Sequence, residues 1–198
     1  MAKMINDRWY RPSKIIDYFL SFCSIPFCFC ILLNFSFYKT NAQFIQAEVG
    51  VDGFTCSMCA LGVENSIRQL PFVEDVKMDL NKGTALISFR KNRVISIFKI
   101  ADKIYDSGFS VRYIHADYNF ETLSVDDYYV YKKGENEFHF IGVGQNSLNG
   151  PVSIVFLNKR LISKKDYTHW EGWIKEDSKK NGKRDNVYYV TLLHGQSF

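Results

Sequence analysis

Beyond residue 42 the chain has almost no net charge. Of its 198 residues, 25 are Lys or Arg and 21 are Asp or Glu, and residues 43–198 keep 20 and 19 of these, a net charge of +1. Because positive and negative side chains nearly cancel, the net charge gives no support to binding of nucleic acid or of an anionic membrane surface. With 46% hydrophobic and 23% charged residues, the composition is that of an ordinary globular protein of one or two small domains.

Cysteine is equally scarce beyond residue 42, where only Cys56 and Cys59 remain of the five in the chain. Two cysteines cannot supply the four protein ligands of a structural zinc site, which excludes a Cys-only zinc site within one molecule. A zinc site assisted by histidine would need partners that are not spaced as a pair, namely His115, His139, His169 or His194. On its own, the C-x-x-C pair is compatible with a metal site, a redox pair or a structural disulfide.

Residues 1–42 have the pattern of an export signal. Basic residues precede an uncharged stretch of 21 residues, 18–38, and Thr40-Asn41-Ala42 supplies the small residues of a cleavage site after Ala42. Export would place the mature protein in the periplasm or cell envelope, where thiols oxidise unless they are kept reduced or metallated. The alternative is an uncleaved N-terminal membrane anchor, because a stretch of this length can span a bilayer. Pro26 and several polar residues argue against that alternative.

Residues 43–116 form the first predicted domain. Apolar alternation predicts strands at 44–51, 73–80, 84–89 and 109–114, and helical spacing predicts helices at 59–70 and 95–108, with Gly108 as a C-terminal cap. In the first strand, the alternation places Ile45, Ala47, Val49 and Val51 in the core. The order strand, helix, strand, strand, helix, strand predicts an α+β fold, a ferredoxin-like βαββαβ sandwich with two helices on one face of the sheet.

Residues 117–198 form the second predicted domain, which is β-rich and of unknown role. Four short runs rich in Tyr, Phe and Val are separated by polar turns, at 128–133, 138–144, 152–158 and 187–193. They predict a small all-β domain, with an OB-like barrel as one candidate. Trp170, Trp173 and Tyr167 are interpreted as core or rim residues in preference to a ligand platform. No catalytic constellation is present here, so an enzyme is not expected.

The two thiols occupy a favourable local position for a soft metal ion. Cys56 falls in the loop before the first helix and Cys59 on its first turn, where unpaired backbone N–H groups and the helix dipole lower thiol pKa values. Gly53 would let the loop fold tightly, and Thr55 is placed to cap the helix. Two thiolates suit ions that accept near-linear coordination by soft ligands, Cu(I) first and Hg(II) second.

The stretch G-F-T-C-S-M-C-A at 53–60, with the flanking strand and helix patterns over 44–114, resembles the heavy-metal-associated domain family. This family includes copper chaperones, the N-terminal modules of copper-transporting ATPases and the periplasmic mercury-binding protein. The resemblance implies that Cys56 and Cys59 are the metal ligands, that Phe109 packs beside the metal loop and that a metal-transporting membrane protein or efflux component is a partner. Phe54 stands where the family usually has Met, and we expect it to keep the same packing role. Met58 is interpreted as an exposed spacer.

The sequence therefore predicts an exported protein that carries or buffers Cu(I), with Hg(II) or Zn(II) as the alternative ion. One competing hypothesis is a thiol-disulfide oxidoreductase, although the chain lacks the Trp before the first Cys and the cis-Pro strand of thioredoxin-like proteins. The other is a structural or interaction module in which the C-x-x-C has no function.

If residues 1–42 are an export signal, the mature protein begins at Gln43. N-terminal sequencing of protein purified from the cell envelope should give a sequence starting Gln43-Phe44-Ile45. An intact Met1 or Ala2 in a membrane fraction would favour the anchor instead.

Overall fold

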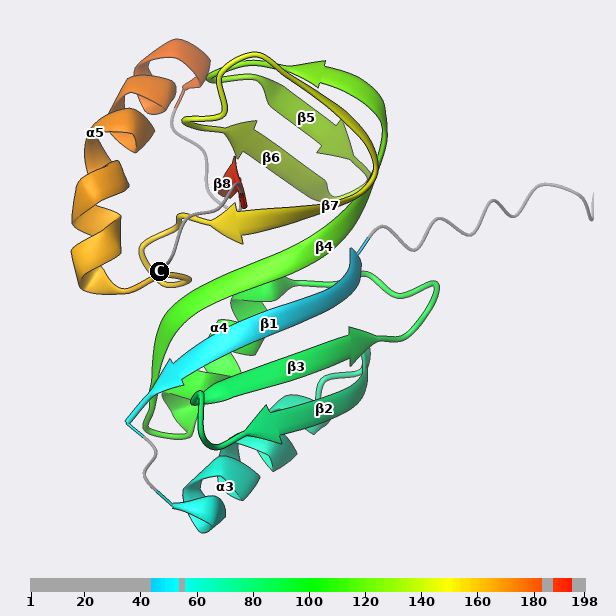
Figure 1. The fold of residues 1–198 in the computed structure, drawn as a ribbon, viewed down its shortest axis with the longest axis vertical. Coiled ribbons are helices and arrows are strands. Elements are labelled where there is room, and N and C mark those ends of the chain that lie inside the picture. Colours follow the sequence, from blue (N-terminus) through cyan, green and yellow to red (C-terminus); the bar gives the residue numbers. More distant parts are fainter. Residues whose placement is uncertain (1–43, 54–55, 183–186, 194–198) are drawn as a thin grey trace, which may run out of the picture. The chain divides into compact units, whose positions relative to one another are not determined.

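A computed structural model of the chain describes residues 44–53, 56–182 and 187–193. The predicted signal or anchor, residues 1–42, lies outside them. The described residues form one compact unit, whose elements are shown in Figure 1. In chain order they are β1 (Phe44–Asp52), α3 (Ser57–Arg68), β2 (Val73–Asp79), β3 (Thr84–Phe89), α4 (Ile97–Asp106), β4 (Ser110–Val125), β5 (Val130–Lys133), β6 (Asn136–Phe140), β7 (Asn146–Phe156), α5 (Lys164–Asn181) and β8 (Tyr188–Leu192).

The first six elements confirm the predicted ferredoxin-like order. Strands β2, β3, β1 and β4 lie side by side in that order, and every pair is antiparallel. Helices α3 and α4 pack on one face, where their apolar stripes bury Val63, Ile67, Ile100 and Ile104 against Ala47 and Val49 of β1. The end of β1, the β2–β3 turn and the start of β4 meet at one end of this sheet, which is also the end from which α3 begins (Figure 1).

The predicted alternation is wrong at the start of β1. Ile45 was expected in the core but is 45% exposed, whereas Phe44 is buried. The cause is a register shift between Phe44 and Gln46 in the ladder with β4, because one extra residue there reverses which side chains face inward. From Ala47 onward, Ala47, Val49 and Val51 are buried as predicted.

Strand β4 is much longer than the predicted strand at 109–114. It spans 16 residues, and it pairs with β1 from Ser110 to Tyr118 and with β7 from His115 to Val125. The two halves therefore share one eight-stranded sheet of order β2-β3-β1-β4-β7-β8-β6-β5. The predicted domain boundary between residues 116 and 117 falls inside this strand.

All four aromatic runs of the C-terminal part contain strands, but the all-β prediction is wrong because this part also contains α5. The helix was missed because only a narrow stripe of it is apolar, and its buried residues are Trp170, Ile174 and Asp177. A start signal is nevertheless present in Ser163-Lys164-Lys165-Asp166. The Ser163 side chain accepts a hydrogen bond from the Asp166 N–H at 3.2 Å and donates one to the Asp166 carboxylate at 2.6 Å. The strands of this part continue the sheet of the N-terminal half, and this order does not support the predicted OB-like barrel.

Helix α5 packs on the face of the sheet opposite to α3 and α4. Along β7, Ile154 and Phe156 belong to the main core, whereas Val155 and Leu157 pack with α5. The interpretation of the tryptophans is confirmed for Trp170, which is buried, but Trp173 is 39% exposed. Among the described residues, no helix has the length and apolar character needed to cross a membrane.

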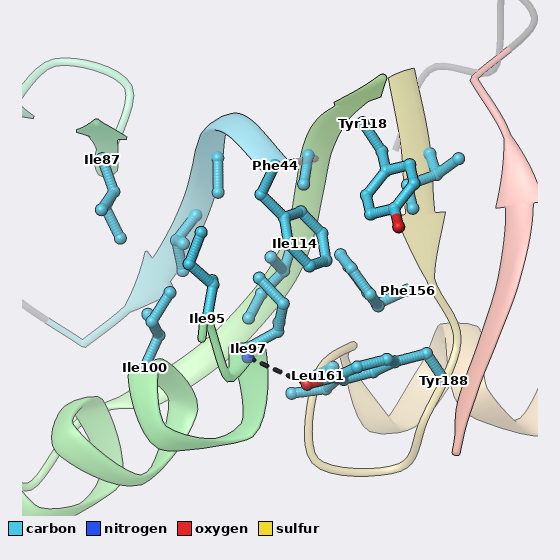
Figure 2. Close-up of a cluster of buried hydrophobic side chains, with 14 of the residues drawn as sticks. Phe44, Ile87, Ile95, Ile97, Ile100, Ile114, Tyr118, Phe156, Leu161 and Tyr188 are labelled. Carbon is cyan, nitrogen blue, oxygen red and sulfur yellow. Dashed lines mark hydrogen bonds between the residues drawn. The ribbon is translucent and has the colours of Figure 1, made fainter. Parts of the chain in front are cut away.

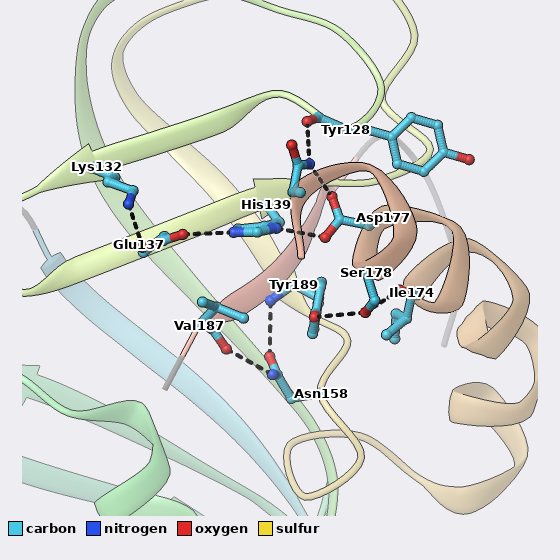
Figure 3. Close-up of polar contacts among 11 residues, drawn as sticks. Tyr128, Lys132, Glu137, His139, Asn158, Ile174, Asp177, Ser178, Val187 and Tyr189 are labelled. Carbon is cyan, nitrogen blue, oxygen red and sulfur yellow. Dashed lines mark hydrogen bonds and ion pairs between the residues drawn. The ribbon is translucent and has the colours of Figure 1, made fainter. Parts of the chain in front are cut away.

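A buried polar network also holds α5 against the sheet (Figure 3). Both ring nitrogens of His139 on β6 lie near carboxylates, Nδ1 2.6 Å from Asp177 and Nε2 2.9 Å from Glu137. Asn181 donates to the other oxygen of Asp177 at 2.8 Å and to the backbone oxygen of Tyr128 at 3.1 Å. Because each buried polar group here has a partner, the cost of burying Asp177 is offset.

Besides the shared strand β4, aromatic packing and a buried hydrogen bond from Ile97 to Tyr188 connect the two halves. The Phe44 ring at the start of β1 lies 4.9 Å from the Tyr118 ring and 6.3 Å from the Phe156 ring, between centroids. The Tyr188 hydroxyl of β8 accepts a hydrogen bond from the Ile97 N–H at 3.1 Å (Figure 2). Ile97 is the first residue of α4, and backbone N–H groups in the first turn of a helix have no partner within that helix. Strand β8 therefore completes the start of a helix in the N-terminal half.

We expect Tyr188→Phe to destabilise the full chain by about 1–3 kcal/mol, because it leaves the buried Ile97 N–H without an acceptor. The matched control is Tyr189→Phe on the same strand. The Tyr189 hydroxyl has only a 3.4 Å contact with Ser178, so its removal should lower the stability by about 0.5 kcal/mol. Urea unfolding of both variants measures the difference. Equal losses would contradict a special role for the Ile97–Tyr188 bond.

Candidate metal-binding site

The predicted metal loop leaves β1 at Asp52 and enters α3 at Ser57. Gly53 has a φ of +104°, a backbone conformation that other residues rarely adopt, so glycine suits this turn. Phe54 and Thr55, which were predicted to support the site, lie outside the described residues. The two cysteines lie where the sequence predicts them, with Cys56 just before the helix and Cys59 in its first turn.

Cys56, and not Thr55, is the N-cap of α3. Its backbone is extended, with φ −139° and ψ 154°, and its Sγ accepts a hydrogen bond from the Cys59 N–H at 3.2 Å. The sulfur thus takes the place of the side-chain oxygen that Ser, Thr or Asp usually provides. The first turn of α3 contains no acidic residue, so the positive end of the helix dipole acts on the two thiols without competition from a carboxylate.

The electrostatic environment favours the thiolate of Cys56. The pKa of this thiol is lowered, first by a hydrogen bond with the Cys59 side chain and next by the Cys59 backbone N–H, with a smaller contribution from the Met58 N–H. Cys56 is exposed and Cys59 is partly buried. Met58 between them is 72% exposed, as an exposed spacer should be. Cys56 is therefore both accessible and biased toward the ionised form that binds soft metals.

Phe109 lies beside the metal loop. Gly108, which follows the C-cap residue Ser107 of α4, has a φ of +84°, and the Phe109 N–H donates to the Ile104 carbonyl at 3.2 Å. This geometry confirms the predicted glycine cap. The next residue, Ser110, pairs with Asp52, so Phe109 and Gly53 flank the same end of the β1–β4 ladder. A Cβ atom at Gly53 would lie 3.4 Å from Cδ1 of the Phe109 ring. The ring thus covers the first residue of the loop.

The histidines do not join the cysteines in a larger donor set. His139 is held by Asp177 and Glu137 in the C-terminal part, His115 stacks on Tyr113 with ring centroids 4.4 Å apart, and His169 is exposed on α5. His194 is outside the described residues. Within the ranges that the structure describes, no group of three or more His, Cys, Asp or Glu side chains is arranged to hold a metal ion.

Residues 48–110 match the heavy-metal-associated domain. Over 66 residues the chain is 36% identical to the copper chaperone CopZ of Bacillus subtilis (strain 168), which covers 33% of this chain and 94% of the chaperone. The chain belongs to the heavy-metal-associated domain family. The family match ends at residue 110, so most of β4 and the C-terminal part lie beyond it.

Two other relatives carry the same domain. A probable copper-transporting ATPase of Arabidopsis thaliana, HMA5, is 37% identical over 74 residues, which is 37% of this chain but only 7% of the ATPase. The structure of oxidized MerP from Ralstonia metallidurans CH34 is 26% identical, with 34% of this chain and 96% of that chain covered and a TM-score of 0.32. The named relatives are thus related to about a third of this chain, its heavy-metal-associated domain.

The donor set of this domain fits a soft monovalent ion. Two thiols sit together at a helix start, and softness of the ligand selects Cu(I) over hard ions. Near-linear coordination needs no third protein ligand, which agrees with a site built from Cys56 and Cys59 alone. The assignment of these two residues as ligands stays a prediction.

We predict that the pH midpoint for alkylation of Cys56 is higher in the Cys59→Ala variant than in the unmodified protein. The substitution removes the main contribution to the lowered pKa, the hydrogen bond with the Cys59 side chain, and leaves the backbone N–H in place. Iodoacetamide labelling across a pH series, resolved by mass spectrometry of the Cys56 peptide, measures the midpoint. Met58→Ala is the control, because it changes an exposed side chain and keeps the backbone donor. An unchanged midpoint in Cys59→Ala would show that the two thiols do not interact.

Proposed function

We propose that the protein is an exported carrier or buffer of soft metal, Cu(I) above all, which binds one ion between Cys56 and Cys59. The observation that carries the proposal is the cysteine pair at the start of α3 in a heavy-metal-associated domain, where the Cys59 backbone N–H donates to the Cys56 sulfur at 3.2 Å. The chain is not proposed to be an enzyme, since the relatives over this domain include proteins named as copper chaperones.

The geometry explains how such a site would hold an ion and also release it. The first turn of α3 offers unpaired N–H groups and the positive end of a dipole, which stabilise the net negative charge of a bis-thiolate complex. The exposed sulfur of Cys56 leaves a path by which thiols of another protein can reach the ion. The Phe109 ring beside Gly53 would limit access of water from one side. Cu(I) is then a cargo that passes between thiolate pairs.

The partner proposed is a metal-transporting membrane protein. The domain is similar to one in a protein named as a probable copper-transporting ATPase, and a chaperone and a transporter that share a domain can exchange an ion between equivalent sites. Export supports the same role, because a thiol pair in an oxidising compartment would be protected by bound metal. The signal pattern in residues 1–42 is the support for export.

The mature chain should bind one Cu(I) per monomer, and Cys56→Ser with Cys59→Ser should abolish binding while the fold is kept. The fold should survive because the sulfurs lie at a loop and a helix start and contribute little to either core, and Ser at position 56 can still cap α3. Anaerobic titration against a Cu(I) chelator measures the stoichiometry, and far-UV circular dichroism measures the fold.

The same titration separates the alternatives. Preference for Hg(II) or Zn(II) over Cu(I) would reassign the cargo but keep the site. Stoichiometric Cu(I) binding by the double Ser variant would show that the site is elsewhere. A protein that binds no soft metal but cycles between dithiol and disulfide would instead support the oxidoreductase hypothesis.

A further inference from the structure

Arg112 on β4 joins three segments at the metal-loop end of the sheet. Its Nη1 atom lies 3.1 Å from Oδ1 of Asp52, the last residue of β1. Its Nη2 atom donates to the Lys82 carbonyl at 2.9 Å and lies 3.4 Å from the Gly83 carbonyl, both in the turn between β2 and β3. The planar fork of an arginine can serve a carboxylate and a carbonyl at once, which a lysine ammonium cannot match.

These contacts fix the end of β1, from which the metal loop begins. Asp52 immediately precedes Gly53, so fixing the Asp52 carboxylate fixes the first anchor of the loop that leads to Cys56. The Gly83 carbonyl also accepts the Val51 N–H at 2.9 Å, which ties the same turn to the end of β1. The second anchor of the loop is α3 itself, which is packed in the core through Val63.

The backbone of Arg112 is in turn held by the C-terminal part. Its carbonyl accepts the N–H of Ser163, the N-cap of α5, at 2.8 Å. Arg160, in the connection between β7 and α5, contacts helix α4. Its Nη2 atom lies 2.7 Å from Oδ1 of Asp102, and its carbonyl accepts a hydrogen bond from the Tyr105 hydroxyl at 3.3 Å. The segment from Arg160 to Ser163 therefore contacts the chain on both sides of the turn that carries Phe109.

We propose that Arg112 is a positioning residue, whose side chain holds the β1 end of the Cys56–Cys59 loop in its metal-binding geometry. This inference rests on the proposed function. A partly exposed ion pair contributes little to global stability, whereas groups that orient metal ligands commonly change metal affinity by about 10- to 100-fold when they are lost. Because the contact to the loop is indirect, through Asp52, the lower end of that range applies. Loss of Arg112 thus affects metal affinity more than folding.

The matched control is Arg68, at the end of α3 remote from the loop. The side chain of Arg68 is 38% exposed and that of Arg112 is 36% exposed, and Arg68 likewise binds carboxylates, of Glu64 and Asp75, and a backbone carbonyl, of Val76. Arg112→Gln should weaken Cu(I) binding about tenfold in competition with a chelator, and Arg68→Gln should leave it unchanged. Urea unfolding should give similar stabilities for both variants.

Arg112→Lys separates position from charge. It keeps the positive charge near the anionic site but lacks the fork, so its affinity should stay close to that of Arg112→Gln. Full recovery by Lys would show that charge alone matters and would overturn the proposal, as would wild-type affinity in Arg112→Gln or an equal loss in Arg68→Gln. Absence of Cu(I) binding by the unmodified protein would instead refute the proposed function itself.

Discussion

The structure depends on strand β4, which joins the two halves of the sheet by pairing with β1 on one side and with β7 on the other. Between His115 and Tyr118, each residue of β4 pairs with a residue of β1 on one side and of β7 on the other, for example His115 with Glu48 and with Val155. A one-residue slip on either side would turn buried side chains of β4, such as Ile114 and Ala116, toward the opposite face. The register of the heavy-metal-associated domain and that of the C-terminal part are therefore set together.

The shared register connects the C-terminal part indirectly to the candidate metal loop. A sheet transmits position through its hydrogen-bond ladder, and the metal loop leaves β1 at the end of the ladder with β4. The C-terminal part adds contacts to both elements that flank Phe109, α4 through Tyr188 and β4 through Ser163. In an isolated domain the start of α4 and the outer edge of β4 would need other partners or water.

Sequence reasoning predicts the family domain well, because its elements are short, strongly periodic and separated by clear turn residues. It fails at Phe44 because a bulge changes the alternation without any sign in the residue types. It misses α5 because the apolar stripe of this helix is narrow and lies among charged residues, although the Ser163 N-cap, with Asp166 three residues later, marks its start. It places the thiol pair correctly but not the cap, since sulfur is an uncommon capping atom. The contacts of Arg112 are long-range and leave no local pattern.

The double role of Cys56 as helix cap and candidate ligand raises the question of whether metal binding would cost the helix its cap. A thiolate sulfur has several lone pairs, and near-linear coordination uses one of them. The N–H of Cys59 can continue to donate to the sulfur, and it does so to a charged acceptor, which makes a stronger hydrogen bond than a neutral thiol. Ionisation of Cys56 therefore strengthens the start of α3 and the donor character of the ligand together. By this argument an apo site with its helix already formed needs little rearrangement to accept an ion.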